Sequence, residues 1–465
     1  MSGFSVMSKE PSIIWAGIKE INDRIDAKYF HYDYMTFNLN DYDKVKNLDQ
    51  CVDFFETGVS NFNEGELRLK RLKTSNIQNN VVLYEDLIDC KIQKKDKRKI
   101  LQKGDVVLTT YGTGSIGKTA YINSDTQIVP DYTIAILRTK SNLDSGYLMS
   151  FFSSSYGNQQ VLRRVIGTSG ITLVIKPHLK DIKIPIPSPE IQKYIGDKVR
   201  RAEELREEAK AAKKDYEYII QDIYYDSNII KFPKGFYTVQ SHDFDDKHLR
   251  IDSNFYNPLY KNGRLNSYKN VKLSKLVDLK KNCKIQAEEE YAYFEIGDLS
   301  TSNILDGKER VKGSELPGRA KLKLEKDDII VSLVQESIEV TSYVDKELNN
   351  TLTTNGCAVL IPRDKSLSGY LYAIISSKYF IAQKCRYISG TNIRSMSKDD
   401  LLDMKIPIVE DEIITKVNGL VLKEFTCLRE SKQLILEAIQ DVEDLIEGDF
   451  EMSELNNNSS TESRC

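Results

Sequence analysis

Several residue types that build common functional sites are scarce in this chain of 465 residues. Only 4 histidines are present, and the 7 cysteines lie far apart without a Cys-x-x-Cys pair, which argues against zinc sites, disulfide frameworks and histidine-based catalytic triads. No run of about 18 apolar residues suggests a membrane span, and the first residues lack a secretory pattern, so we expect a cytoplasmic protein without membrane contact. The formal net charge of -3 excludes a globally basic nucleic-acid binder but leaves room for locally basic faces.

The chain contains two copies of one sequence pattern, offset by 222 to 227 residues. The recurring stretches are Arg24-Ile25-Asp26 and Arg250-Ile251-Asp252, Ser75-Asn76-Ile77 and Ser302-Asn303-Ile304, Lys103-Gly104-Asp105-Val106-Val107 and Lys326-Asp327-Asp328-Ile329-Ile330, Gly146-Tyr147-Leu148 and Gly369-Tyr370-Leu371, Gly167-Thr168 and Gly390-Thr391, and Lys183-Ile184-Pro185-Ile186 and Lys405-Ile406-Pro407-Ile408. Their order is the same in both copies over about 160 residues, which predicts a duplicated domain.

Each copy ends in a run of strong helix formers with apolar residues at alternating spacings of four and three. One such stripe alone also fits a helix buried in a core, but two stripes at equivalent places favour an antiparallel coiled coil. The seam residues are Ile195, Ala202, Leu205, Ala209, Tyr216 and Ile223 in the first helix, and Val421, Leu428, Ile435, Ala438 and Val442 in the second. The same stripes are amphipathic enough to bind a partner protein.

The remainder predicts an α/β (α+β) fold without the regular alternation of a doubly wound sheet. Short strands are expected within 103–121 and 128–137, followed by a helix over 146–156, and the second copy repeats this order. We therefore expect two tandem, similar globular domains separated by two long helices. The expected boundaries are 1–190 and 229–409 for the domains, 191–228 and 410–448 for the helices, and 449–465 for a disordered tail.

Two motifs resemble enzyme signatures. Gly112-Thr113-Gly114-Ser115-Ile116-Gly117-Lys118-Thr119 has the spacing of a phosphate-binding loop, which needs a helix directly behind it. The residues that follow, 120–125, instead predict a strand and a turn, and the second copy lacks the glycines and the lysine. Asn257-Pro258-Leu259-Tyr260 differs by one residue from an amino-methyltransferase tetrapeptide, but it follows the repeated Arg-Ile-Asp stretch and fits a structural turn. A nucleotide-binding enzyme or an S-adenosylmethionine-dependent DNA methyltransferase thus stays an alternative function.

Basic residues stand next to small hydroxyl-rich loops at matching places in both copies. Arg163-Arg164 precedes Gly167-Thr168-Ser169-Gly170, and Lys384 and Arg386 precede Ser389-Gly390-Thr391-Asn392. A charge run often marks only a solvated face. However, hydroxyl and backbone NH groups bind phosphates, and arginine and asparagine bind base edges, so the recurrence favours contact with DNA.

The succession of these motifs resembles the specificity subunit of type I restriction-modification systems over residues 10–448. The residues that carry the resemblance are Arg24-Ile25-Asp26-Ala27, Lys103-Gly104-Asp105-Val106-Val107, Gly114-Ser115-Ile116-Gly117-Lys118, and Ile184-Pro185-Ile186-Pro187 followed by Gln192. The second copy departs from this pattern, having Glu336-Ser337-Ile338-Glu339-Val340 in place of the glycine motif and Ile408-Val409-Glu410-Asp411 at the helix entry. The first departure suggests that the two domains have different DNA targets.

The resemblance implies that each globule is a target recognition domain for one half of a split double-stranded DNA site. It implies a non-catalytic chain that binds two adenine-N6 methyltransferase subunits, with or without restriction subunits, while S-adenosylmethionine and ATP with magnesium bind to those partners. The expected DNA-binding residues are Thr110, Tyr111, Thr113, Ser115, Lys118, Arg163, Arg164, Thr168 and Ser169 in the first copy, and Gln335, Glu336, Arg386, Ser389, Thr391, Asn392 and Arg394 in the second. A coiled-coil scaffold that binds proteins through its helices remains the other alternative.

Overall fold

The computed structural model describes residues 44–62, 65–78, 80–167, 172–224, 240, 255–256, 268–300, 304–390, 392 and 394–450. The chain divides into two compact units. Unit 1 comprises residues 1–204 and 430–465, and unit 2 comprises 205–429. The repeated Arg-Ile-Asp stretches, the tetrapeptide 257–260 and the tail from residue 451 lie outside the described residues. Within the described part, no helix combines the length and the apolar character that a membrane span needs.

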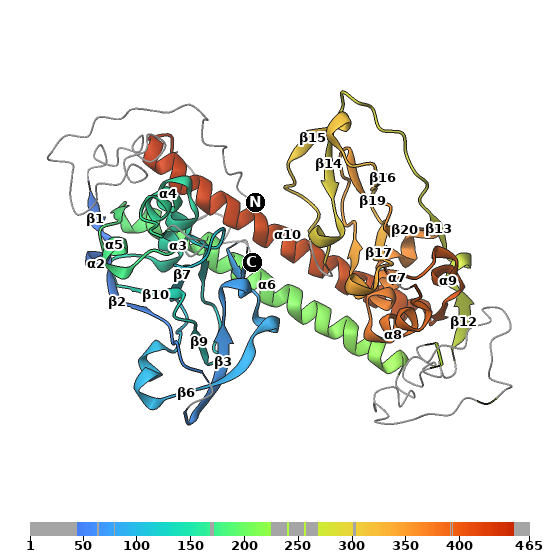
Figure 1. Cartoon of the computed structure of the whole chain (residues 1–465), viewed down its shortest axis with the longest axis horizontal. Helices are drawn as coiled ribbons and strands as arrows, with labels where there is room; N and C mark the ends of the chain where they lie inside the picture. The colour runs from blue at the N-terminus through green and yellow to red at the C-terminus, as the bar shows by residue number, and fades with distance from the viewer. Residues whose placement is uncertain are drawn as a thin grey trace. The chain divides into compact units, whose positions relative to one another are not determined.

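Unit 1 is built on a four-stranded sheet with the strand order β2-β10-β7-β8 (Figure 1). Its strands are β2 (Val52–Thr57), β7 (Val106–Thr109), β8 (Thr119–Tyr121) and β10 (Ile134–Thr139). One face packs on two helices, α3 (Ser145–Ser153) and α4 (Ser155–Arg163), which fill the larger apolar core of the unit. The other face packs on a smaller core that includes Leu72 and Ile128 of a second sheet.

This second sheet of unit 1, called here the distal sheet, has the order β6-β3-β9. It consists of β3 (Leu67–Leu72), β6 (Ile88–Ile92) and β9 (Ile128–Pro130), and a 3-10 helix, η5 (Lys94–Lys99), follows β6. Strand β3 is antiparallel to β6 and parallel to β9. The remaining short elements of the unit are β1 (Val45–Asn47), α2 (Leu48–Cys51), η3 (Thr74–Asn76), β4 (Ile77–Gln78), β5 (Val81–Val82), η4 (Tyr84–Asp86), α5 (Lys176–Lys180) and β11 (Lys183–Pro185).

Unit 2 repeats this arrangement, with a fourth strand in its distal sheet. Its main sheet has the order β13-β20-β17-β18, and its distal sheet has the order β15-β14-β19-β16. The strands are β13 (Val277–Leu279), β14 (Glu290–Phe294), β15 (Arg310–Lys312), β16 (Ala320–Lys323), β17 (Ile329–Ser332), β18 (Thr341–Tyr343), β19 (Thr351–Thr354) and β20 (Cys357–Pro362). The other elements are β12 (Lys269–Lys272), η7 (Leu273–Lys275), η8 (Ile296–Asp298), η9 (Gly313–Glu315), η10 (Gln335–Ser337), η11 (Lys365–Leu367), α7 (Ser368–Ile375), α8 (Lys378–Tyr387), α9 (Lys398–Asp403) and β21 (Lys405–Ile408). The predicted mixed fold with two similar domains is confirmed.

The repeated sequence motifs make the same contacts in both units. The hydroxyl of Tyr147 donates to the carbonyl of Pro185 at 2.9 Å, and that of Tyr370 donates to Pro407 at 2.7 Å. The turn before the first central strand needs a left-handed residue, which is Gly104 with φ 94° in unit 1 and Asp327 with φ 73° in unit 2. The duplicated motifs are thus contacts that hold the fold.

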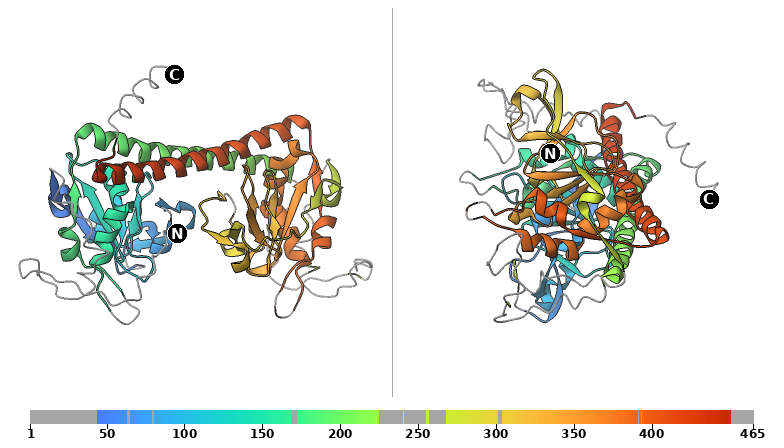
Figure 2. Two further views of the ribbon diagram at one scale, coloured as in Figure 1. Left: turned by 90° about the horizontal axis from the view of Figure 1, so that it is seen from above. Right: turned by 90° about the vertical axis from the view of Figure 1, so that its right-hand side faces the viewer.

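Two long helices complete the units, α6 (Pro189–Ile223) and α10 (Asp411–Glu447). In each unit a segment of α6 lies against a segment of α10 (Figure 2). The predicted seam residues are all buried except Leu428, which is half-buried. Polar seam positions find partners across the helix pair: Lys198 binds Asp441 at 2.7 Å in unit 1, and the Tyr216 hydroxyl donates to Glu424 at 2.9 Å in unit 2.

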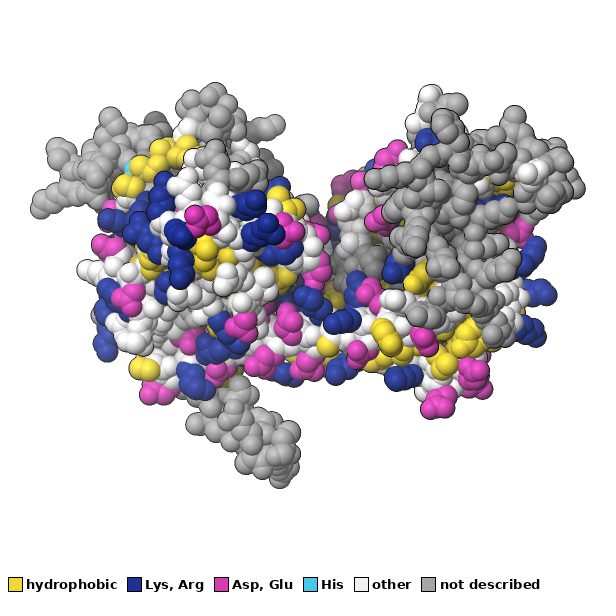
Figure 3. Space-filling view, turned by 90° about the horizontal axis from the view of Figure 1, so that it is seen from below, with side chains coloured by type: hydrophobic (Ala, Val, Ile, Leu, Met, Phe, Trp, Pro, Cys, Tyr) yellow, Lys and Arg dark blue, Asp and Glu magenta, His cyan; other side chains and the backbone are white. Residues whose placement is uncertain are grey.

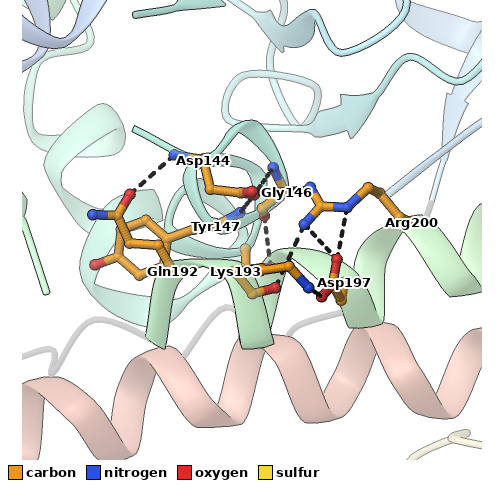
Figure 4. Close-up of polar contacts among 8 residues, drawn as sticks. Asp144, Gly146, Tyr147, Gln192, Lys193, Asp197 and Arg200 are labelled. Atoms are coloured by element: carbon orange, nitrogen blue, oxygen red, sulfur yellow. Dashed lines mark hydrogen bonds and ion pairs between the residues drawn. The ribbon is translucent and has the colours of Figure 1, made fainter. Parts of the chain in front are cut away.

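The globule of unit 1 is joined to α6 by a half-buried polar network at the start of α3 (Figure 4). Asp144 caps α3, because its carboxylate accepts hydrogen bonds from the backbone of Gly146 and Tyr147. Arg200 of α6 binds the same carboxylate at 3.0 Å, and Gln192 accepts a hydrogen bond from the Asp144 amide. A side chain at Gly196 would place its Cβ 2.0 Å from the Asp144 Oδ1, so this helix position needs glycine.

Unit 2 caps the equivalent helix in a different way. Leu367 stands where unit 1 has its capping aspartate, and Asn418 of α10 supplies the acceptor for the Tyr370 amide at 2.7 Å. The cap therefore comes from the globule in unit 1 and from the long helix in unit 2. Because a carboxylate and an asparagine side chain would compete for the same space, each globule fits the helix of its own unit.

Candidate nucleic-acid interface

The predicted contact residues of unit 1 gather where β7 ends. The loop 110–118 leaves β7 and lies beside the β-hairpin that follows α4. Ile166 and Leu173 exchange two backbone hydrogen bonds at 2.8 and 2.9 Å, and the amide of Val174 donates to the carbonyl of Thr110 at 2.8 Å. The amide of Gly112 donates to the carbonyl of Thr172 at 3.0 Å. Two stretches that are far apart in the sequence thus form one surface of unit 1.

The loop 110–118 is not a phosphate-binding loop in structure. Strand β8 follows it directly, as predicted, so no helix N-terminus points into it. Gly112, Gly114 and Gly117 all have positive φ, and the amides of Ser115 and Gly117 donate to carbonyls of the loop and of β7. Because these amides bind the protein itself, the glycines serve a tight connection between two strands.

Unit 2 brings its predicted residues together in the same way. Ser389 and Ser395 exchange two backbone hydrogen bonds at 2.9 and 2.8 Å, and the amide of Gln335 donates to the carbonyl of Arg394 at 2.9 Å. The residue after each first partner, Ile166 or Ser389, is a glycine in the left-handed region, Gly167 with φ 110° and Gly390 with φ 109°. We call each pairing of a loop with its hairpin the reading edge of that unit.

Most of the predicted side chains at the two reading edges are accessible. Thr113, Glu336, Ser389 and Asn392 are exposed, and Tyr111, Ser115, Lys118, Arg163, Gln335, Arg386 and Arg394 are half-buried. Thr168, Ser169 and Thr391 lie outside the described residues. The two edges also differ in chemistry: the first presents threonine, tyrosine and lysine, whereas the second presents glutamine, glutamate and asparagine.

Two predicted contact residues of unit 1 are structural. Thr110 is buried, and its hydroxyl donates to the carbonyl of Thr133 at 3.0 Å. Arg164 is also buried, and its guanidinium donates to the carbonyls of Gln160 at 2.8 Å and Asp181 at 3.1 Å. Side chains that are buried and donate to internal carbonyls do not reach a ligand, so we remove both residues from the candidate interface.

The basic pair of unit 2 also has an internal role. Arg386 donates to the carbonyl of Phe255 at 2.8 Å, and its guanidinium lies 4.2 Å from the centre of the Phe255 ring. Lys384 is fully buried, and its ammonium nitrogen has no hydrogen-bond partner among the described residues. Burial lowers the pKa of Lys384 from 10.5 to about 8. The matched residue of unit 1 is Val161, which is equally buried.

One accessible aromatic residue escaped the sequence interpretation. Tyr132 is 46% exposed and stands edge-on to Tyr111, with 5.4 Å between the ring centres. It lies just beyond β9, far from the glycine loop in the sequence, and no repeat marks it, because the matched residue is Asn355. An accessible tyrosine paired with a half-buried one, beside hydroxyl groups, is suited to stacking and hydrogen bonding. The described residues contain no group of three or more acidic, histidine or cysteine side chains placed to hold a metal ion.

One family model matches most of the chain. The model of the type I restriction modification DNA specificity domain matches residues 53–215 and 252–447. Among solved structures, the chain is similar to a type I restriction-modification S subunit from M. genitalium, with 15% identity, a TM-score of 0.43, and coverage of 90% of this chain and 98% of that one. It is also similar to an HsdS subunit from Thermoanaerobacter tengcongensis, with 15% identity, a TM-score of 0.29 and coverage of 88% and 96%. Curated proteins give no match.

Proposed function

Because the chain belongs to the family of type I restriction-modification DNA specificity domains, we propose that it is the non-catalytic subunit that selects the target of a type I restriction-modification complex. Each unit reads one half of a bipartite, asymmetric double-stranded DNA site. The subunit positions two adenine-N6 methyltransferase subunits, and restriction subunits where the complex includes them. In this proposal S-adenosylmethionine and ATP with magnesium bind to those partner subunits, and the complex works in the cytoplasm.

The observation that supports this proposal is the pair of reading edges. Both have the same backbone hydrogen bonds, so both present loop and hairpin side chains in the same way. Their side chains differ, as two readers of different half-sites require. Arginine, lysine, asparagine, glutamine, serine and threonine supply donors and acceptors for phosphates and base edges in the major groove.

The long helices fit a spacing role in this proposal. Helices of 35 and 37 residues extend about 50 to 55 Å at 1.5 Å per residue. One turn of DNA is about 34 Å long, so a connector of this length suits two half-sites separated by a gap.

Arg394 provides the test of base reading. The test uses targets in which one half-site is kept and the other is varied. Arg394→Ala should reduce methylation of these targets by about ten- to a hundredfold, because a bidentate base contact contributes roughly 1–3 kcal/mol. The matched control is Arg363→Ala. Arg363 follows β20 at the end opposite to the reading edge, since Ser332 of β17 pairs with Cys357 at the start of β20.

Methylation of a target library by the chain together with its methyltransferase subunits measures the effect. The proposal requires that Arg394→Ala changes the preference at one half-site only and that Arg363→Ala leaves both unchanged. An equal loss at both half-sites would contradict base reading by Arg394. Binding of S-adenosylmethionine or ATP by the chain alone, in a calorimetric titration, would favour an enzyme, and DNA-independent capture of proteins by the helices alone would favour a scaffold.

A further inference from the structure

The distal sheets of the two units differ in charge although their strands correspond. Residues 67–99, from β3 through η5, contain 10 Lys and Arg and 4 Asp and Glu, a net charge of +6. The matched residues 290–322 of unit 2 contain 5 Lys and Arg and 6 Asp and Glu, a net charge of -1. The two segments form equivalent strand pairs, β3 with β6 and β14 with β15. The excess of positive charge in unit 1 is therefore not needed for the fold.

Two cations face each other across the strand pair of unit 1. Arg68 of β3 is directly opposite Lys91 of β6, and both are exposed. The nearby Lys70 is bound to Asp89 at 2.9 Å, so this carboxylate serves a different cation. Like charges directly opposite in an antiparallel pair destabilise a sheet. In unit 2 the equivalent exposed pair joins opposite charges, because Glu290 of β14 is directly opposite Lys312 of β15.

The 3-10 helix η5 extends this positive surface. Lys94 and Arg98 bind Glu66 and Glu56 at 2.6 and 2.9 Å. Lys95 and Lys97 are exposed, and within the described residues neither forms an ion pair. Figure 3 shows lysine and arginine side chains gathered on this face of unit 1. Within the part of the chain that the structure describes, four cations of the distal sheet and the helix that follows it have no protein counter-ion, namely Arg68, Lys91, Lys95 and Lys97.

We propose that Arg68, Lys91, Lys95 and Lys97 form a phosphate-binding surface for the DNA duplex, separate from the reading edge, and that unit 2 has no counterpart. This inference rests on the proposed function. Unit 1 then supplies most of the salt-dependent affinity of the chain, and unit 2 depends on base contacts and on partner subunits. Phosphate contacts position a protein on DNA without carrying sequence information.

Salt dependence tests the surface quantitatively. Each phosphate contact releases counter-ions and contributes about 0.9 to the slope of log K against log salt. The double variant Arg68→Gln, Lys91→Gln of the full chain should lower this slope by about 2, equally for duplexes with and without the target. The control, Lys323→Gln with Lys326→Gln, removes two exposed lysines from β16 and the turn after it in unit 2 and should change the slope by less than about 0.5.

Fluorescence anisotropy with labelled duplexes between 50 and 300 mM salt, roughly the range over which such slopes develop, gives the measurement. Thermal unfolding should show no loss of stability in the first variant, because a repulsive pair is removed, and this excludes misfolding as the cause. Equal slopes for both variants, or a wild-type chain without salt-dependent binding, would overturn the surface. A changed methylation sequence would also overturn it, because the residues would then read bases. Sequence selection itself is tested separately through Arg394.

Discussion

Lys384 offers the sharpest test of the physical reasoning, because its side chain is buried and its charge is not paired within the described part of the chain. Its exposed fraction is 0%, and none of the residues that the structure describes forms a hydrogen bond with its ammonium nitrogen. The matched position of unit 1 holds Val161, which shows that the fold accepts an apolar side chain at this point of the helix. Replacing Lys384 by methionine keeps the length of the side chain and removes the charge, with little change in packing.

The size of the destabilisation by the buried charge follows from the pKa of Lys384. Burial lowers the pKa of Lys384 from 10.5 to about 8. One pKa unit corresponds to about 1.4 kcal/mol, so the buried charge costs about 3 kcal/mol below pH 8. Between pH 8 and 10.5 the unfolded chain binds more protons at this group than the folded chain. The free energy of unfolding of the wild type therefore rises through this interval.

Lys384→Met should consequently be more stable than the wild type by about 3 kcal/mol at pH 7, and the gain should largely disappear by pH 10.5. Urea unfolding followed by circular dichroism at both pH values measures it, with a midpoint about 1 M higher for the variant at pH 7. The reciprocal change, Val161→Lys, should lower the free energy of unfolding of unit 1 at pH 7, and this loss should shrink toward pH 10.5. A gain that is independent of pH, or a loss at pH 7, would refute the argument.

Two further predictions concern the long helices. Gly196→Asn and Asp144→Leu introduce the capping arrangement of unit 2, and each alone should lower the free energy of unfolding by about 1–2 kcal/mol. The double variant should lose at least about 1 kcal/mol less stability than the sum of the two single losses. Strict additivity of the losses in chemical denaturation would disprove a shared cap. Asp441→Asn should cost about 3 kcal/mol, because it neutralises the nearest counter-ion of the largely buried Lys198 and leaves only Glu437, at 3.9 Å. Lys198→Met with Asp441→Leu should be nearly as stable as the wild type. Equal melting temperatures for the single variant and the wild type would contradict this.

The sequence predicted the parts of the fold that depend on periodicity and duplication. Helical spacing identified α6 and α10, which begin at Pro189 and Asp411, within two residues of the expected positions. The repeat also predicted that loop and hairpin stretches have matching roles, because equivalent motifs occupy equivalent places in two folded copies. Periodicity and repetition can be recognised in the sequence because many residues contribute to each pattern.

The burial of single polar residues could not be predicted in the same way. Arg163 and Arg164 are neighbours of one type at the end of α4, yet the first is half-buried and the second is fully buried against two carbonyls. Successive helix residues point about 100° apart, so one reaches solvent when the other faces the core. Which of the two is buried depends on the path of residues 160–181, and that path is a property of the tertiary structure.

The comparison of the units explains how a duplicated domain can acquire a second specificity. The hydrogen bonds at the reading edges join backbone atoms, for example Gly112 to Thr172 in unit 1 and Gln335 to Arg394 in unit 2. Glycine and glutamine share the same backbone position because the contact does not involve the side chain. Substitutions at these positions therefore change the groups offered to DNA without loss of the edge itself.

The same logic applies to the distal sheets, where equivalent strand pairs carry net charges of +6 and -1. A fold held by backbone pairing and buried tyrosines leaves its outer side chains free to diverge, so we expect the two halves of the target to differ in sequence and in their dependence on salt.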